Sequence, residues 1–173
     1  MLEIVEAPNN SNTNNPIKLF LAGGISNCPN WQKDIINQLL NPTRSHIVPI
    51  LNNVTVYNPR RENFSIYDPE LNREQITWEY EKLRSCNLLA FWFSSGSVNP
   101  IGLFEYGKHG LSQATELIVG IDPEYSRNVD VEIQTSLAKP NQKIVYSLTD
   151  FYNQIVSSTF DMLQQMKIQI YEK

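Results

Sequence analysis

The sequence has few of the features that mark nucleic-acid-binding, membrane or secreted proteins. It contains 14 Lys and Arg against 18 Asp and Glu, with no basic block, which argues against a nucleic-acid polymer as partner. No apolar run approaches the roughly 20 residues that span a bilayer. The N-terminus lacks a basic region followed by an apolar one, so no secretory signal is predicted. We therefore expect a cytoplasmic protein without a membrane partner.

Residues of metal and nucleophile chemistry are also scarce. The two cysteines, Cys28 and Cys86, lack metal-ligand spacing, and without an export signal we expect them to be free thiols. No Ser-His-Asp set and no cluster with zinc or iron spacing is evident. The G-x-G-x-x-G and G-x-x-x-x-G-K-[ST] patterns are absent, so the usual dinucleotide and P-loop interpretations fail. We expect neither a metal nor a cofactor.

The remaining composition suits one globular domain, because 173 residues with 41% hydrophobic content can bury a core of ordinary size. Residues 1–16 end in the polar run "PNNSNTNNP", which has nothing to bury and predicts a flexible tail. The domain itself is then expected over residues 17–173.

Five short apolar runs alternate with helical patterns along this domain: "IKLFLAGG", "VTVYNPRR", "NLLAFWF", "ELIVGI" and "KIVYSL". Buried strands separated by helical crossovers predict an α/β fold. The expected architecture is a five-stranded parallel, doubly wound (flavodoxin/Rossmann-like) sheet with helices on both faces. Ligands of such sheets bind beyond the carboxyl ends of the strands, which directs attention to the loops there.

Two of these loops carry candidate binding residues. Gly23 and Gly24 in "LAGGISN" let a backbone approach a ligand closely, and a plain strand-to-helix turn is the alternative. Arg60 and Arg61 in "NPRR" follow the second strand. Arginine binds phosphate or carboxylate bidentately, and a solvated surface pair is the alternative.

Glu79 lies in the helical pattern "QITWEYEKL", at the edge of its apolar stripe. A carboxylate in that position is partly desolvated or hydrogen-bonded. The alternative is a salt bridge, with Lys82 or with an arginine of the preceding loop.

The stretch "NPIGLFEYGKHG" places Gly102, Gly107 and Gly110 around Glu105, although each glycine costs about 1 kcal/mol in a helix interior. Asn99 is predicted as the N-cap, which puts Glu105 in the second helical turn. Its carboxylate then lies over Gly102, which is expected to leave room for a ligand atom. We expect Glu105 to be ionised by donors from "AGG" or "SSGS". The alternative is glycines that serve close packing beside a surface carboxylate.

The ordered pieces "FLAGGI", "YNPRR", "QITWEYEKL", "FWF", "GLFEYG" and "IVGIDPEYSRN" resemble the nucleoside 2-deoxyribosyltransferase-like family. The resemblance extends over roughly residues 17 to 138. It departs from the family at Phe20, near the position where an activating tyrosine often stands, and in "SSGSVN", which lacks the acidic residues of several transferases.

The resemblance implies a role for each matching residue. Glu105 matches the nucleophilic glutamate, and Glu79 matches a helix carboxylate near the sugar, where aspartate is usual. Gly23 and Gly24 match the loop that lines the sugar pocket. Asn128 matches an asparagine that completes the site of a neighbouring subunit, so a homo-oligomer is expected.

The expected activity is cleavage or transfer of the N-glycosidic bond of a 2′-deoxynucleoside through a covalent glutamyl-sugar intermediate, by analogy with retaining glycosidases. The partner is then a small nucleoside or nucleotide. Two alternatives stay open: hydrolysis of deoxynucleoside monophosphates, and a non-catalytic nucleotide-sensing module.

Overall fold

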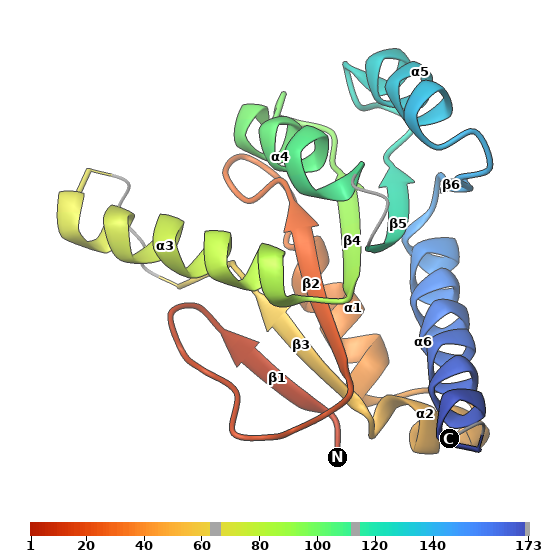
Figure 1. The fold of residues 1–173 in the computed structure, drawn as a ribbon. Helices are drawn as coiled ribbons and strands as arrows, with labels where there is room; N and C mark the ends of the chain where they lie inside the picture. Colours follow the sequence, from red (N-terminus) through yellow and green to blue (C-terminus); the bar gives the residue numbers. More distant parts are fainter. Residues whose placement is uncertain (63–66, 112–114, 172–173) are drawn as a thin grey trace.

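The computed structural model describes residues 1–62, 67–111 and 115–171 (Figure 1). Its single sheet has the strand order β1-β3-β2-β4-β5-β6, and every neighbouring pair is parallel. The strands are β1 (Glu3–Glu6), β2 (Ile17–Gly23), β3 (Val54–Asn58), β4 (Leu88–Phe93), β5 (Glu116–Ile121) and β6 (Ile144–Val145).

Helices cover both faces of this sheet, as the sequence predicts (Figure 1). Alternate strand residues face opposite ways, so Leu19 and Leu21 pack with α1, α2 and α6, whereas Phe20 packs with α3, η2 and α5. The central strands β3 and β4 are buried throughout. The helices are α1 (Trp31–Leu40), η1 (Ser45–Ile47), α2 (Val48–Leu51), α3 (Pro69–Ser85), α4 (Pro100–Glu105), η2 (Tyr106–Gly110), α5 (Asn128–Ala138) and α6 (Leu148–Tyr171).

The parallel, doubly wound architecture is confirmed, but the predicted strand count of five is wrong, because the sheet has six strands. The additional strand, β1, lies within the predicted flexible tail, residues 1–16. It pairs with the edge of β3, from Glu3 opposite Thr55 to Glu6 opposite Asn58. The polar run after it stabilises this pairing, because Ser11, Asn12 and Thr13 donate hydrogen bonds to the Glu3 carboxylate.

The topology places a switch point between β2 and β4. After β2 the chain crosses to β3 on one side, and after β3 it crosses back to β4 on the other side. The connections above β2 and β4 therefore diverge, which opens a crevice at their carboxyl ends. The segment after β2 lies beside α4 at this end of the molecule (Figure 1).

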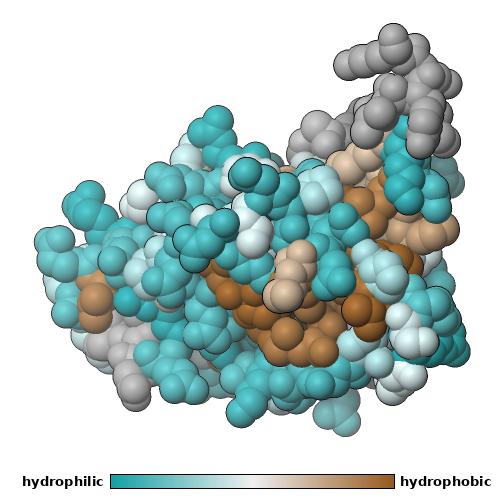
Figure 2. All heavy atoms as spheres, turned by 90° about the horizontal axis from the view of Figure 1, so that it is seen from below, coloured by the Kyte–Doolittle hydropathy of each residue, from teal (hydrophilic) through white to brown (hydrophobic). Residues whose placement is uncertain are grey.

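Figure 2 shows the opposite end of the molecule, below the amino ends of the strands. That end is mostly hydrophilic, with apolar surface near its middle and toward the right of the view. Within the described parts of the chain, no helix combines the length and the apolarity needed to cross a bilayer.

Candidate functional site

A cleft of about 490 Å³ lies at the carboxyl end of β2, between α3 and α4. This volume falls within the range of small-molecule binding sites. Polar side chains reach it from four segments of the chain: the loop after β2, the loop after β3, α3, and the β4–α4 connection with α4. The lining residues are Phe20, Ala22, Gly23, Gly24, Ile25, Ser26, Pro59, Arg61, Asn72, Gln75, Ile76, Glu79, Ser97, Asn99, Pro100, Ile101, Gly102 and Glu105.

The cleft brings together four residues that the sequence analysis selected separately. Glu79 comes from the middle of α3, and Glu105 is the last residue of α4. Gly23 and Gly24, at the end of β2, lie in the same wall. Two carboxylates from different helices thus face one cavity beside exposed backbone.

Gly23 cannot be replaced by a larger residue without moving the chain. Its φ of +136° is rare for residues with a side chain, and a Cβ there would lie 2.1 Å from the Trp92 carbonyl oxygen. A Cβ at Gly24 would lie 2.4 Å from the Asn99 side-chain oxygen and 2.6 Å from the Cys28 sulfur. Both glycines therefore serve close packing at the switch point and also leave backbone exposed to the cleft.

Asn99 is the N-cap residue of α4, as predicted, and its carbonyl oxygen accepts the first helical hydrogen bond, from the Leu103 N–H at 3.0 Å. Its backbone is left-handed, with φ of +52°, and its side chain makes no capping hydrogen bond. The amide instead donates to the Ser94 carbonyl oxygen at 3.4 Å, and its oxygen accepts from the Cys28 thiol at 3.4 Å. Asn99 therefore ties the β4–α4 connection to the segment after β2, and α4 begins at Pro100 as expected.

Gly102 lies against the loop after β2 and also lines the cleft beside Glu105. A Cβ at this position would lie 3.5 Å from the Gly23 Cα, which is ordinary van der Waals contact. The packing of the helix against the loop therefore does not require a glycine here. That Gly102 leaves room for a ligand atom stays a prediction.

Glu79 is held by a neighbour on its own helix. The side-chain amide of Gln75, four residues earlier, donates to the Glu79 Oε1 atom at 2.8 Å. Burial raises the pKa of Glu79, and this hydrogen bond opposes the rise because it stabilises the ionised form. Glu79 is therefore both desolvated and hydrogen-bonded.

Glu105 has no such support, since no described residue donates a hydrogen bond to its carboxylate in the structure. Burial, and then the negative charge of Glu79, raise the pKa of Glu105 to about 8. The expected donors from "AGG" and "SSGS" do not reach it. This raised pKa favours the protonated form of Glu105 near neutral pH, in contrast to the expectation of a carboxylate that loop donors keep ionised.

The two arginines of "NPRR" have different positions. The Arg60 guanidinium donates to the carbonyl oxygens of Ile25 and Cys28, so it braces the segment after β2 from outside the cleft lining. Arg61 lines the cleft itself, paired with Glu74 at 2.9 Å. The sequence does not distinguish neighbouring arginines, because the turn of the loop decides which of them points inward.

Asn128 lies at the start of α5 and is not among the cleft-lining residues of this chain. Its side-chain oxygen accepts a hydrogen bond from the Val129 backbone at 2.7 Å.

Sequence reasoning missed Asn72 and Gln75, which line the cleft, whereas Ser97 belongs to the "SSGS" segment that it did select. One signal could have found Gln75, because residues four apart on a helix are neighbours and Gln75 precedes Glu79 by four.

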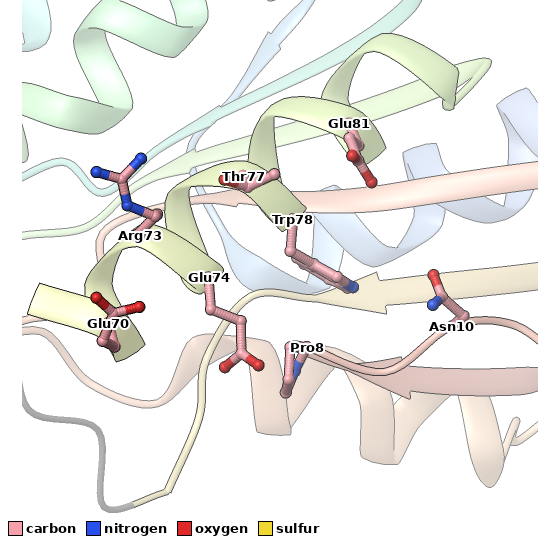
Figure 3. Close-up of a pocket in the computed structure, with 8 residues that line it drawn as sticks. All are labelled: Pro8, Asn10, Glu70, Arg73, Glu74, Thr77, Trp78 and Glu81. Atoms are coloured by element: carbon pink, nitrogen blue, oxygen red, sulfur yellow. The ribbon is translucent and has the colours of Figure 1, made fainter.

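A second hollow of about 380 Å³ lies beside α3, where Trp78 points toward the segment that carries Pro8 and Asn10 (Figure 3). The Trp78 indole N–H donates to the Asn9 carbonyl oxygen at 2.7 Å, so this contact fastens the segment after β1. The hollow is open to solvent, and neither Glu79 nor Glu105 lines it. Among the described residues, no group of three or more His, Cys, Asp or Glu could hold a metal ion.

Comparison with known proteins gives both a family and a fold. A family model described as "Nucleoside 2-deoxyribosyltransferase like" matches residues 16–125. No curated protein matches the chain. The crystal structure of a conserved protein from Enterococcus faecalis V583 is similar at 13% identity and a TM-score of 0.50, covering 82% of this chain and 98% of that one. At this identity the likeness concerns the fold alone.

The region matched by the family model spans more than half of the chain and carries Gly23, Gly24, Glu79 and Glu105. The chain therefore belongs to the nucleoside 2-deoxyribosyltransferase-like family.

Proposed function

We propose that this protein cleaves or transfers the N-glycosidic bond of a 2′-deoxynucleoside. The observation that carries the proposal is the pair of carboxylates, Glu79 and Glu105, which face one cleft from two helices. Beside them, Gly23 and Gly24 line the same cleft. Family membership supports the same chemistry.

In the proposed reaction a Glu105 carboxylate oxygen bonds to the anomeric carbon of the sugar as the bond from that carbon to the base nitrogen breaks. The bonding electrons leave with the base, which takes up one proton. Another base, or water, then displaces Glu105 and regenerates the carboxyl group. Attack by a base makes the enzyme a transferase, and attack by water makes it a hydrolase.

Arg61 favours a second candidate, hydrolysis of a deoxynucleoside 5′-monophosphate. Its guanidinium lines the cleft, and a guanidinium matches the geometry of a phosphate group. Phosphate would then compete with Glu74 for Arg61.

We also propose that the protein forms a homo-oligomer in which Asn128 contributes to a neighbouring site. Three apolar side chains of α5, Val129, Ile133 and Leu137, are more than half exposed at helical spacing. They lie along the length of the helix that begins at Asn128. A second copy of the chain that covered α5 would bury this stripe.

The test is incubation with deoxynucleosides or their 5′-monophosphates, with and without free purines and pyrimidines, followed by chromatography. Exchanged nucleosides support transfer, and free base with free sugar supports hydrolysis. A strong preference for monophosphates that Arg61→Gln removes supports the second candidate. Saturable binding without turnover would overturn the enzymatic proposal and favour a sensing module.

A further inference from the structure

Gln75 is a buried amide whose polar atoms face three neighbours at the wall of the cleft. Only 6% of the residue is exposed. Its Nε2 atom donates to the Pro59 carbonyl oxygen at 2.7 Å and to the Glu79 Oε1 atom at 2.8 Å. Its Oε1 atom accepts a long hydrogen bond from Arg61 at 3.5 Å. The amide therefore links the loop after β3 to one of the two carboxylates.

The chemistry of these neighbours fixes the orientation of the Gln75 amide. The Pro59 carbonyl oxygen and the Glu79 carboxylate are acceptors, whereas Arg61 can only donate. Rotating the amide by 180° would place its oxygen against two acceptors and its NH₂ group against a guanidinium. Nε2 therefore faces Glu79, and it favours the ionised carboxylate because hydrogen bonds to charged groups are stronger than those to neutral groups.

Among the described residues that line the cleft, Glu105 is the only other carboxylate. Arg61 is the one further titratable residue of this lining. On α3, Glu74 already pairs with Arg61. On η2, Lys108 and His109 contact the Tyr80 ring rather than the cleft.

The two carboxylates of the pair therefore differ in their affinity for a proton. Glu79 receives a hydrogen bond from Gln75, whereas Glu105 receives none from the described residues. Two desolvated carboxylates in one cavity do not both ionise readily. The one without a donor is the better place for the single proton.

We propose that Gln75 is a positioning residue that holds Glu79 as the anion of the pair, so that the pair's single proton lies on Glu105 until catalysis. This inference rests on the proposed N-glycosidic reaction for its consequence, but not for its geometry. The pair then stores the one proton that the departing base needs. As the bond from Glu105 to the sugar forms and the bond to the base breaks, this proton passes to Glu79 and from Glu79 to the base nitrogen, and no other acid is required.

Titration of the wild-type protein tests the proton's place without any assay of turnover. Carboxyl groups of ¹³C-labelled glutamate are followed by NMR over pH, with Glu79→Gln and Glu105→Gln to assign the signals. We expect Glu105 to titrate near pH 8 and Glu79 to titrate lower. The reverse order would overturn the proposal.

Gln75→Met removes the donor at similar volume, and Gln164→Met, at an exposed position of α6, is the matched control. In Gln75→Met the titration of Glu79 should rise by about one pH unit, the size expected from losing a hydrogen bond to a charged group. In an active enzyme the acid limb of the pH profile of kcat/KM should rise similarly, with about tenfold lower kcat/KM near its former midpoint. Gln164→Met should change neither.

The failures of the two proposals are distinguishable. If the wild type cleaves no nucleoside but the Glu79 titration rises in Gln75→Met, the positioning role stands and the proposed function falls. If the wild type is active and a folded Gln75→Met variant leaves both titrations and the pH profile unchanged, Gln75 has no positioning role. If Gln75→Met does not fold, the wild-type order of titration decides alone.

Discussion

Glu3 and Glu105 are both partly buried carboxylates, yet their surroundings shift their pKa values in opposite directions. At the N-terminal strand, Glu3 accepts hydrogen bonds from Ser11, Asn12, Thr13 and Thr55. Burial alone would raise its pKa, but these donors outweigh it and lower the pKa of Glu3 to about 2. At the cleft, burial and the charge of Glu79 raise the pKa of Glu105 to about 8.

This difference in pKa distinguishes a carboxylate that stabilises the fold from one that is suited to react with a substrate. A fully hydrogen-bonded carboxylate gains its stability from the fold and has little reason to exchange a proton or bond to a substrate. A desolvated carboxylate without donors is costly in the folded state, and such perturbed groups in clefts mark candidate functional sites. We therefore expect changes at Glu105 to affect activity, and changes at Glu3 to affect only stability.

The largest expected effect is on turnover. Glu105→Ala should lower the rate of base exchange or hydrolysis by about a thousandfold or more, because a covalent nucleophile is lost. Glu3→Ala should leave the rate nearly unchanged at a temperature where it is folded. Chromatographic rates of the two variants and the wild type check this, with mass spectrometry for a glycosyl adduct on Glu105. An active wild type with near-normal Glu105→Ala rates would contradict the assigned nucleophile and make Glu79 the next residue to test.

The backbone wall of the cleft gives the next largest effect. Gly23→Ala should destabilise the protein by about 3 kcal/mol, because the new methyl group meets the Trp92 carbonyl oxygen in a backbone conformation that favours glycine. Gly102→Ala is the matched control, and we expect less than about 1 kcal/mol of change in either direction, since the added Cβ finds ordinary contacts and helix propensity improves. Urea unfolding measures both. Equal stability of the two variants would contradict this prediction, because it would show that the backbone at Gly23 can move away from the Trp92 carbonyl oxygen at little cost in free energy.

Much of this organisation could be predicted from sequence because it depends on local pattern. Short apolar runs between helical segments identify a parallel sheet, and the ends of its strands then direct attention to Gly23 and Gly24. Helix position likewise indicates that Glu79 and Glu105 are not ordinary surface charges. These inferences need no knowledge of distant contacts.

The remaining features depend on contacts between segments far apart in the chain. β1 is only four residues long, and it is stabilised by pairing with β3 and by the donors around Glu3, none of which periodicity reveals. Asn99 is a residue type whose side chain often caps helices, yet here the side chain forms hydrogen bonds with Cys28 and Ser94 instead. The protonation of Glu105 likewise follows from burial beside Glu79, which requires the relative placement of α3 and α4.

The cleft carboxylate should also lower stability at alkaline pH. Glu105 has a raised folded-state pKa, so the protein is most stabilised, relative to Glu105→Gln, below the unfolded value of 4.5 and loses that advantage as pH rises toward about 8. Above pH 8 we expect Glu105→Gln to be more stable than the wild type by about 2 kcal/mol, allowing for solvent in the open cleft. Thermal unfolding at pH 4.5, 6.5 and 8.5 measures the difference. A pH-independent difference would mean that Glu105 is not desolvated.

The smallest effect, with the opposite sign, is expected at Glu3. Its folded-state pKa is lowered, so its contribution is present above the unfolded value of 4.5 and is lost as pH falls toward about 2. Glu3→Gln should therefore lower the free energy of unfolding by about 1 kcal/mol at pH 7, because the strand is partly exposed and solvent screens the carboxylate. The deficit should shrink as the pH falls from 4.5 toward 2, since the wild-type carboxylate then becomes neutral as well. Urea unfolding at pH 7, 4 and 3 follows this convergence, and hydrogen exchange of the β1 amides reports whether the loss is local. A Glu3→Gln deficit that grows toward acid pH would contradict the hydrogen-bonded carboxylate and would make the two regions alike.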